Sequence, residues 1–315
     1  MRCLLTLVTE SVLAIMSTSS LNAAGAASAF ATHGPIHLAV TDRDRSVAWW
    51  RAIAGLQIVV DHGDSAELGV DGDPIVVLRP TARYPVHEGY TGLYHFAINL
   101  PDEVAFAQTL ARLLRSGAAL STTDHIVAKS MYVVDPDGIA VELTVETPER
   151  VASIEWPETA TQPNVIDVEG RLRHGLEPLD VEAALAKLPA GELPRQLASG
   201  TRMGHVHLKV SDLDTAYSFY RDGLGFLPEN YAPLIGYADL GTGDFRVHRI
   251  AVNTWQGAGL PPRPAEMAGM EHFTLRFDSQ ARLDEVLAKV EAVDRREGGY
   301  VARDPSGNAI ALLAA

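Results

Sequence analysis

The chain contains an internal repeat, and this repeat restricts the fold more than any other property of the sequence. Residues 37–44 (HLAVTDRD) match residues 207–214 (HLKVSDLD), and both copies continue to an aromatic pair, an arginine and a glycine. His37 therefore aligns with His207, at an offset of 170 residues. Self-similarity at a fixed distance indicates that two stretches of the chain form the same structural unit.

Two shorter matches divide each copy again. Residues 92–96 (GLYHF) correspond to residues 269–273 (GMEHF), and residues 135–138 (DPDG) correspond to residues 304–307 (DPSG). The sequence therefore predicts four related modules, at residues 34–82, 91–147, 203–256 and 268–315.

Each module is expected to form a βαβββ unit. It opens with an alternating apolar segment typical of a strand and then reaches a residue that can begin a helix, such as Asp42 or Asp212. An amphipathic stretch follows, toward a glycine suited to a left-handed helix end, as at Gly55. Short strands rich in Val, Ile and Tyr complete the unit. The predicted fold class is therefore α+β.

Grouped in chain order, the modules form two predicted domains, at residues 34–147 and 203–315. The connector between them, residues 148–202, is rich in proline and contains one expected helix at residues 179–188, and we interpret it as a strap that joins the two halves. Residues 1–33 are interpreted as an extension, with a cleaved secretion signal ending near residue 29 as the alternative. We accordingly expect a cytoplasmic protein, or a periplasmic one if a signal is cleaved.

Cysteine content and charge exclude several classes of function. The single cysteine, Cys3, leaves no cysteine-rich metal site, so histidine and carboxylate must hold any metal. The formal net charge of −14 argues against nucleic acid as a partner. Beyond the N-terminal segment, no stretch approaches the roughly 18 apolar residues that a membrane span needs. We therefore expect neither a nucleic acid nor a membrane as partner.

Strand alternation places several chemically active side chains on one side of the predicted sheets, because neighbours on a strand point to opposite faces. His95 is expected to face away from the apolar side of the strand that opens module two. That apolar side consists of Tyr94, Phe96, Ile98 and Leu100. His205 and His207 likewise oppose the apolar side of the strand that opens module three. Glu142 opposes the apolar side of the last strand in module two.

Two imidazoles and one carboxylate are the ligands of a facial Fe(II) site. His95, His205 and Glu142 therefore form a candidate metal site. A single histidine on such a face more often lines a barrel than binds a metal, and that interpretation is the alternative for both histidines. Glu142 is the stronger indication, because a carboxylate between Val141 and Leu143 is costly to bury without a partner.

Three segments resemble the vicinal oxygen chelate superfamily: residues 203–206 (MGHV), 92–98 (GLYHFAI) and 132–138 (YVVDPDG), the last of which leads to Glu142. Within this superfamily the chain is most similar to the four-module, catechol 2,3-dioxygenase-like proteins. The resemblance implies that the modules pair into two half-open barrels. It also implies an Fe(II)-dependent extradiol dioxygenase that cleaves a small aromatic diol with O2, with Mn(II) able to replace the iron.

The resemblance further implies roles for individual residues. It identifies the three residues of the candidate metal site as the ligands. Tyr132, ten residues before the glutamate, corresponds to a catalytic tyrosine. His248, expected on the last strand of module three, corresponds to the acid–base histidine. His125 and His207 are expected as hydrogen-bonding partners behind or beside the ligands.

Departures from the repeat predict how the modules pair. Pro35 stands where module three has its histidine ligand, and module four has Ala311 and Val301 at the positions of the glutamate and the tyrosine. The ligand set is complete only if modules two and three face each other. We therefore predict that modules one and four form a second, metal-free barrel. A chain-order site completed by His37 is the alternative.

Two other classes of function are the alternatives to a dioxygenase. One is a glyoxalase-like metal-dependent isomerase or lyase, which would ordinarily need a second carboxylate where module three offers His248. The other is a non-catalytic protein that binds a small molecule. A homo-oligomer is compatible with the resemblance, although no heptad or self-complementary motif in the sequence points to one.

Overall fold

The computed structural model describes residues 29–156, 161–243, 247–256, 258–290, 293–296 and 299–315. Most of the N-terminal extension, residues 1–28, lies outside the described residues, and so does any signal sequence within it. The first strand already begins at Ala31, ahead of the boundary expected at residue 34.

The first two modules fold as βαβββ units. Module one consists of β1 (Ala31–Ala39), α1 (Arg43–Trp49) with its π-helical extension η1 (Trp50–Ala54), β2 (Gln57–Asp61), β3 (Ala66–Val70) and β4 (Asp73–Arg79). Module two consists of β5 (Gly92–Asn99), α2 (Glu103–Ser116), β6 (Ser121–Asp124), β7 (Ala128–Val134) and β8 (Ala140–Glu146).

The last two modules repeat this order, which confirms the predicted α+β fold class. Module three consists of β12 (Arg202–Lys209), α4 (Leu213–Ser218) with η3 (Phe219–Gly223), β13 (Leu227–Ala232), η4 (Pro233–Ile235), β14 (Tyr237–Gly241) and β15 (Ile250–Asn253). Module four consists of β16 (Gly269–Phe277), α5 (Gln280–Leu287), β17 (Val293–Arg296), β18 (Gly299–Arg303) and β19 (Ala309–Ala314).

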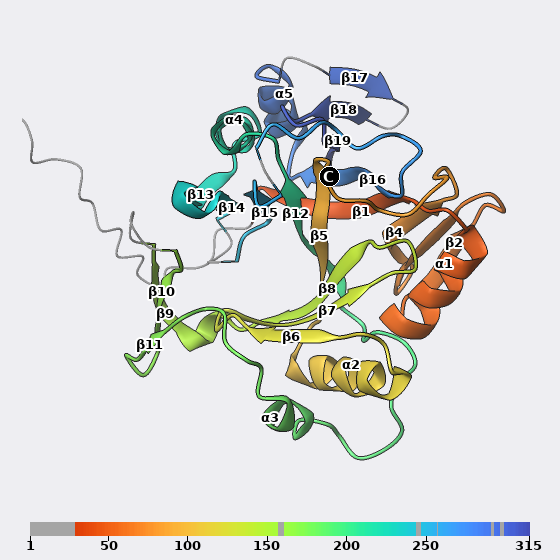
Figure 1. Cartoon of the computed structure of the whole chain (residues 1–315), viewed down its shortest axis with the longest axis vertical. Helices are drawn as coiled ribbons and strands as arrows, with labels where there is room; N and C mark the ends of the chain where they lie inside the picture. Colours follow the sequence, from red (N-terminus) through yellow and green to blue (C-terminus); the bar gives the residue numbers. More distant parts are fainter. Residues whose placement is uncertain (1–28, 157–160, 244–246, 257, 291–292, 297–298) are drawn as a thin grey trace, which may run out of the picture.

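Helix ends follow the capping residues of the sequence. The side chains of Asp42, Asp102 and Asp212 each accept a hydrogen bond from an amide in the first turn of the helix that follows. Gly55 and Gly117 end their helices with φ of 88° and 70°, a left-handed conformation that glycine adopts at little cost. In module two, the capped helix α2 lies beside strands β6–β8 (Figure 1).

The strands form two eight-stranded sheets, and each sheet combines two modules. One sheet has the order β13-β14-β15-β12-β5-β8-β7-β6, so modules three and two meet through their opening strands. The other has the order β17-β18-β19-β16-β1-β4-β3-β2, which joins modules four and one in the same way. The predicted discontinuous pairing is therefore observed. We call the two halves the 2–3 barrel and the 1–4 barrel.

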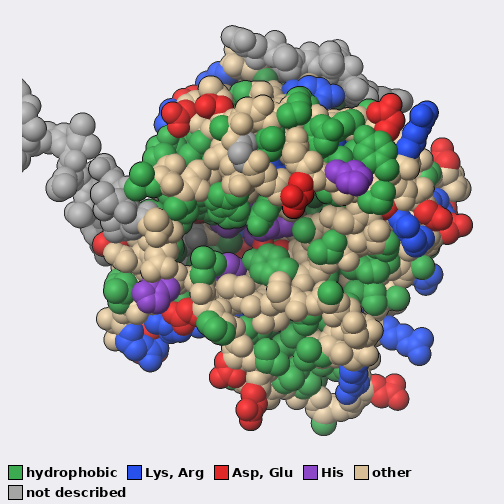
Figure 2. Space-filling model, in the orientation of Figure 1, with side chains coloured by type: hydrophobic (Ala, Val, Ile, Leu, Met, Phe, Trp, Pro, Cys, Tyr) green, Lys and Arg blue, Asp and Glu red, His purple; other side chains and the backbone are tan. Residues whose placement is uncertain are grey.

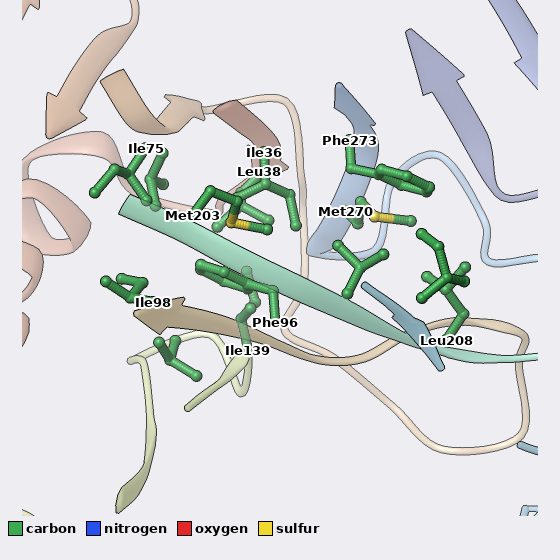
Figure 3. Packing of buried hydrophobic residues seen from close by; sticks show 14 of the residues in the cluster. Ile36, Leu38, Ile75, Phe96, Ile98, Ile139, Met203, Leu208, Met270 and Phe273 are labelled. Carbon is green, nitrogen blue, oxygen red and sulfur yellow. The ribbon is translucent and has the colours of Figure 1, made fainter. Parts of the chain in front are cut away.

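The two barrels share one hydrophobic core (Figure 3). Phe96 and Leu208 from the 2–3 barrel and Leu38 and Phe273 from the 1–4 barrel are fully buried in this cluster. Trp50, at the end of the first helix, stacks on Phe96 of module two with ring centroids 5.8 Å apart. Because side chains alternate along a strand, this packing directs the remaining side chains to the opposite side of each sheet.

The connector joins the two halves and also has secondary structure of its own. It contains η2 (Pro148–Arg150) and a small sheet of β9 (Val151–Glu155), β10 (Asn164–Asp167) and β11 (Leu172–Arg173). Its helix α3 (Val181–Leu185) is shorter than the predicted one, because Asp180 caps it by accepting a hydrogen bond from the Ala183 amide.

Within the described residues, no helix combines the length and the apolar character that crossing a membrane would require.

Candidate metal centre

Three side chains converge in the 2–3 barrel. Glu142 Oε2 lies 3.0 Å from His95 Nε2 and 3.3 Å from His205 Nε2, and the two imidazole nitrogens are 3.4 Å apart. All three residues are buried. The candidate metal site that strand alternation indicated is therefore a compact cluster of one carboxylate oxygen and two ring nitrogens.

Strand register brings these residues together. Strand β12 pairs antiparallel with β5, and β5 pairs parallel with β8, where Ala97 lies opposite Glu142. A β-bulge in β12 between Met203 and Val206 adjusts the position of His205. Gly204 permits this bulge, because a Cβ there would lie 2.2 Å from Asn99 Oδ1.

The charge on Glu142 is matched by its surroundings. Burial opposes ionisation, but the imidazoles of His205 and His95 outweigh it and hold the pKa of this carboxyl well below its ordinary value. Ser130 Oγ donates a hydrogen bond of 2.5 Å to Glu142 Oε1. This contact leaves Oε2 directed at the two histidines. Burial lowers the pKa of His205, which favours the uncharged ring that can act as a ligand.

Tyr132 and His125 form a hydrogen-bonded pair beside the cluster. The ring of Tyr132 lies against His95 at 5.6 Å between centroids, and its hydroxyl is 2.9 Å from His125 Nε2. His125 Nδ1 lies 2.9 Å from the carbonyl oxygen of Gly175, which can only accept, so Nδ1 carries the proton. Tyr132 must then donate to Nε2. The connector, which supplies Gly175, thereby sets the tautomer of His125.

His248 lies next to the cluster but not on a strand. Its ring is 4.4 Å from that of His205, yet it precedes β15, which begins at Ile250, so the expected position on the last strand is wrong. Residues 247–249 precede β15 without forming part of a strand. His248 Nδ1 is 3.5 Å from Asp239 Oδ2, and burial lowers the pKa of this imidazole to about 3.

Aromatic side chains border the cluster on another side. His207 lies across the strand pair from His95 with ring centroids 4.9 Å apart, and Asn253 Nδ2 donates to His207 Nε2 at 2.8 Å. Tyr94 and Trp255 each pack against His207, with centroids 4.8 Å and 5.4 Å away. Both aromatic residues are partly exposed. Figure 2 shows histidine and acidic side chains inside a hollow edged by hydrophobic ones.

The position of Tyr94 differs from the sequence expectation. It was expected on the apolar side with Phe96, but its ring contacts His95 and His207. A register shift between His207 and Leu208 leaves Tyr94 as the extra residue of a bulge in β5. Because of this bulge, Tyr94 does not follow the alternation of side chains between the two faces of β5.

Several other residues of the site could not be identified from the motifs of the sequence. Ser130 lies on β7 two residues before Tyr132, so alternation along that strand could have identified it. Asp239, Tyr237 and Trp255 come from parts of module three that no motif marks. Tyr237 stacks on Trp255 at 5.9 Å and donates to Asp239 Oδ2 at 2.7 Å.

In the 1–4 barrel, the described residues at the positions of Glu142 and Tyr132 have no carboxylate or phenol group. Val301 pairs with Ala311 at the position where Tyr132 pairs with Glu142 in the other barrel. His37 stacks on His272 with ring centroids 4.0 Å apart. The alternative of a chain-order site completed by His37 is therefore wrong, because β1 joins the other sheet.

Comparison with known families agrees with this architecture. The family model of the Glyoxalase/Bleomycin resistance protein/Dioxygenase superfamily matches residues 32–143 and 202–312, which together cover most of the chain. The chain belongs to this superfamily. The two matched stretches begin and end close to the module pairs that are consecutive in sequence, although the barrels combine modules differently.

Individual relatives extend the comparison. A protein of Bacillus subtilis (strain 168) named catechol-2,3-dioxygenase is 31% identical over 287 residues, which span 88% of this chain and 95% of that protein. A putative dioxygenase structure from Bacillus subtilis superposes with a TM-score of 0.55 at 13% identity, covering 89% of this chain and 84% of the other. A glyoxalase I mutant from Zea mays gives 0.50 at 17% identity, covering 90% and 94%. These two structures establish similarity of fold.

Proposed function

We propose that this protein is an extradiol dioxygenase that binds Fe(II), or Mn(II) in its place, and cleaves a catechol-type aromatic diol with O2. The observation that carries the proposal is the convergence of His95, Glu142 and His205 beside Tyr132 and His248. The similarity to a protein named catechol-2,3-dioxygenase supports the same reaction class.

The cluster fits a divalent transition metal. Two ligands bonded at about 2.1 Å to one ion and at right angles to each other are separated by about 3 Å. The three donor atoms here are separated by 3.0, 3.3 and 3.4 Å. One carboxylate and two imidazoles suit Fe(II) and Mn(II), and three protein ligands leave coordination positions for substrate. His95, Glu142 and His205 would hold the ion.

When bound, Fe(II) supplies electrons to dioxygen and lowers the pKa of the diol hydroxyl groups. Tyr132 contributes a fixed hydrogen-bonding atom. Because its hydroxyl donates to His125 Nε2, its oxygen lone pairs remain to accept a hydrogen bond from a substrate hydroxyl.

His248 is the proposed proton acceptor. Its Nδ1 lies beside the Asp239 carboxylate group, so Nε2 is the ring nitrogen available to substrate. Burial keeps the imidazole neutral, which is the form that can remove a proton from a hydroxyl group and later return it. Asp239 is itself held by Tyr237 and by the Asn230 amide at 2.7 and 2.8 Å, and this orients the ring.

The aromatic border favours a flat, apolar substrate body. Tyr94, Trp255 and the neutral ring of His207 offer faces and edges against which an aromatic ring can pack. A planar diol would have its hydroxyl groups near the ligand cluster and its ring against these side chains.

The test is anaerobic reconstitution with Fe(II), quantification of bound iron, and addition of a panel of catechols in air-saturated buffer. We expect oxygen uptake together with a yellow ring-cleavage product. Glu142→Ala should lose both iron and oxygen uptake, whereas Glu182→Ala, at an exposed position on α3, should retain both. An iron-loaded protein that consumes no oxygen with any catechol would contradict the proposal.

A further inference from the structure

The 1–4 barrel contains a pocket that the metal centre does not explain. Its volume is about 910 Å³, within the range of small-molecule sites. Strands β16, β18 and β19 form its floor, and the segments that follow β4 and precede β16 form its sides. It lies in the other sheet from His95, Glu142 and His205, so it is a separate site.

Small residues open the floor of this pocket. Ala311 and Val301 occupy the positions that Glu142 and Tyr132 occupy in the 2–3 barrel, and Pro35 occupies that of His205. The stacked imidazoles of His37 and His272 form a further wall. Burial, followed by the neighbouring His272, lowers the pKa of His37 to about 3, so this ring is neutral. The part of the floor at Ala311, Val301 and Pro35 is therefore apolar.

Positively charged side chains surround this apolar part of the floor. Five arginines line it, and we call them the pocket arginines: Arg79, Arg83, Arg263, Arg276 and Arg303. Among the described residues, two carboxylates, Glu266 and Glu271, line it as well. The protein as a whole carries a formal charge of −14. The local excess of cationic side chains in this pocket is therefore opposite in sign to the net charge of the protein. Such a concentration attracts anions.

Two pocket arginines are available to a ligand. Among the described residues, the guanidinium groups of Arg83 and Arg276 have no hydrogen-bond or ion-pair partner. Arg79 lies 3.7 Å from Glu271, which also accepts a hydrogen bond from Thr81. Guanidinium groups bind carboxylates through two parallel hydrogen bonds, and this geometry suits arginine better than lysine.

We propose that the 1–4 barrel is a second ligand site, which binds a small organic carboxylate with its anionic groups on the pocket arginines and its apolar body on the floor at Ala311 and Val301. The apolar floor and the charge of the arginines together select the ligand. An inorganic anion would leave the floor uncovered, and a neutral aromatic would leave the arginines unpaired.

The experiment is calorimetric titration of the full-length protein with phthalate, an aromatic dicarboxylate. Benzene-1,2-dicarboxamide serves as the neutral probe of the same shape, and inorganic phosphate serves as the anion without an apolar body. We expect phthalate to bind more tightly than either, with an affinity that falls as salt concentration rises.

Substitutions in the pocket test whether phthalate binds there. Arg83→Gln and Arg276→Gln should each weaken phthalate binding by about fivefold, since each removes one partly exposed charge. Ala311→Phe should abolish it by filling the floor. Arg115→Gln, at an exposed position in the last turn of α2, should have no effect. Glu142→Ala should also leave phthalate binding unchanged, which separates this site from the metal centre.

Three results would overturn the proposal. The first is equal affinity for phthalate and its diamide, which would remove the role of charge. The second is phosphate binding as tight as phthalate binding and insensitive to Ala311→Phe, which would reduce the site to a charged surface. The third is phthalate binding that survives both arginine substitutions in a folded protein.

Discussion

One hydroxyl group orients the carboxylate of the metal centre. Ser130 Oγ holds Glu142 Oε1, and this leaves Oε2 as the atom shared with His95 and His205. Ser130 Oγ is also 3.0 Å from the Thr144 hydroxyl, so its own position is constrained. Partners that orient a ligand affect metal affinity although they do not touch the metal.

Ser130→Ala should therefore weaken Mn(II) binding by about 10- to 100-fold, because the carboxylate is free to rotate away from the histidines. Titration of the metal-free protein with Mn(II) measures this. Ser65→Ala is the control, since that hydroxyl bonds only the exposed Asp64 side chain. Unchanged Mn(II) affinity in a folded Ser130→Ala protein would remove Ser130 from the site.

Gly204 is required for close approach of two strands. A methyl group there would lie 2.2 Å from Asn99 Oδ1, and Asn99 is buried with its amide nitrogen bonded to Glu146. We expect Gly204→Ala to lower the free energy of unfolding by about 2 kcal/mol. Urea unfolding checks this. Gly223→Ala, whose new Cβ would meet only Phe219 at 3.9 Å, should be close to neutral.

At the level of secondary-structure elements, the connector is bound to the β6–β7 turn by hydrogen bonds and an ion pair. Asp124 accepts hydrogen bonds from both Arg150 Nη atoms, at 3.0 and 2.8 Å, and its main chain pairs with Glu177 of the connector. The next residue is His125, which holds the Tyr132 hydroxyl. The connector therefore positions a side chain of the candidate site.

Arg150→Met should destabilise the protein by about 2 kcal/mol, because it leaves the largely buried carboxylate of Asp124 without its ion pair. Thermal or urea unfolding gives the value. Arg282→Met breaks a surface pair with Glu285 and should cost no more than about 0.5 kcal/mol. Similar losses for the two variants would indicate that the Arg150 pair is no more important than a surface one.

At the level of the whole molecule, the two barrels repeat one design with different side chains. Strand β1 has a bulge between His33 and Ile36, as β12 has between Met203 and Val206. Thr274 pairs with Ala311, as Ala97 pairs with Glu142. The 1–4 barrel therefore keeps the backbone of a metal site and the equivalent of His95, His272, without the other two ligands.

Pro35→His combined with Ala311→Glu should restore a ligand set, with His272 as the third member. We expect the double variant to bind a second metal ion per chain, measured by elemental analysis after loading with Mn(II). Pro35→His alone should not gain the second ion, because it lacks the carboxylate. A folded double variant with unchanged metal content would mean that the two barrels differ in backbone as well as in side chains.

Much of the architecture could be predicted because it depends on local properties. The repeat identified four modules, and the pleat of a strand, which alternates side chains between faces, separated His95 and His205 from the apolar core. Because Pro35 and Ala311 interrupt the ligand pattern, even the pairing of modules two and three could be inferred from sequence.

Other features depend on contacts between segments that are far apart in the chain. The bulge that moves Tyr94 into the site arises from the register between β5 and β12, which alternation within one strand does not contain. The hydrogen bond that sets the tautomer of His125 ends on the carbonyl oxygen of Gly175 in the connector, and the pocket arginines come from module one, module four and the segments beside them. The sequence by itself thus determined which residues face each hollow, since that follows from the chirality and pleat of the chain. Only the tertiary structure decided which of them meet, since strand register and loop packing depend on both partners at once.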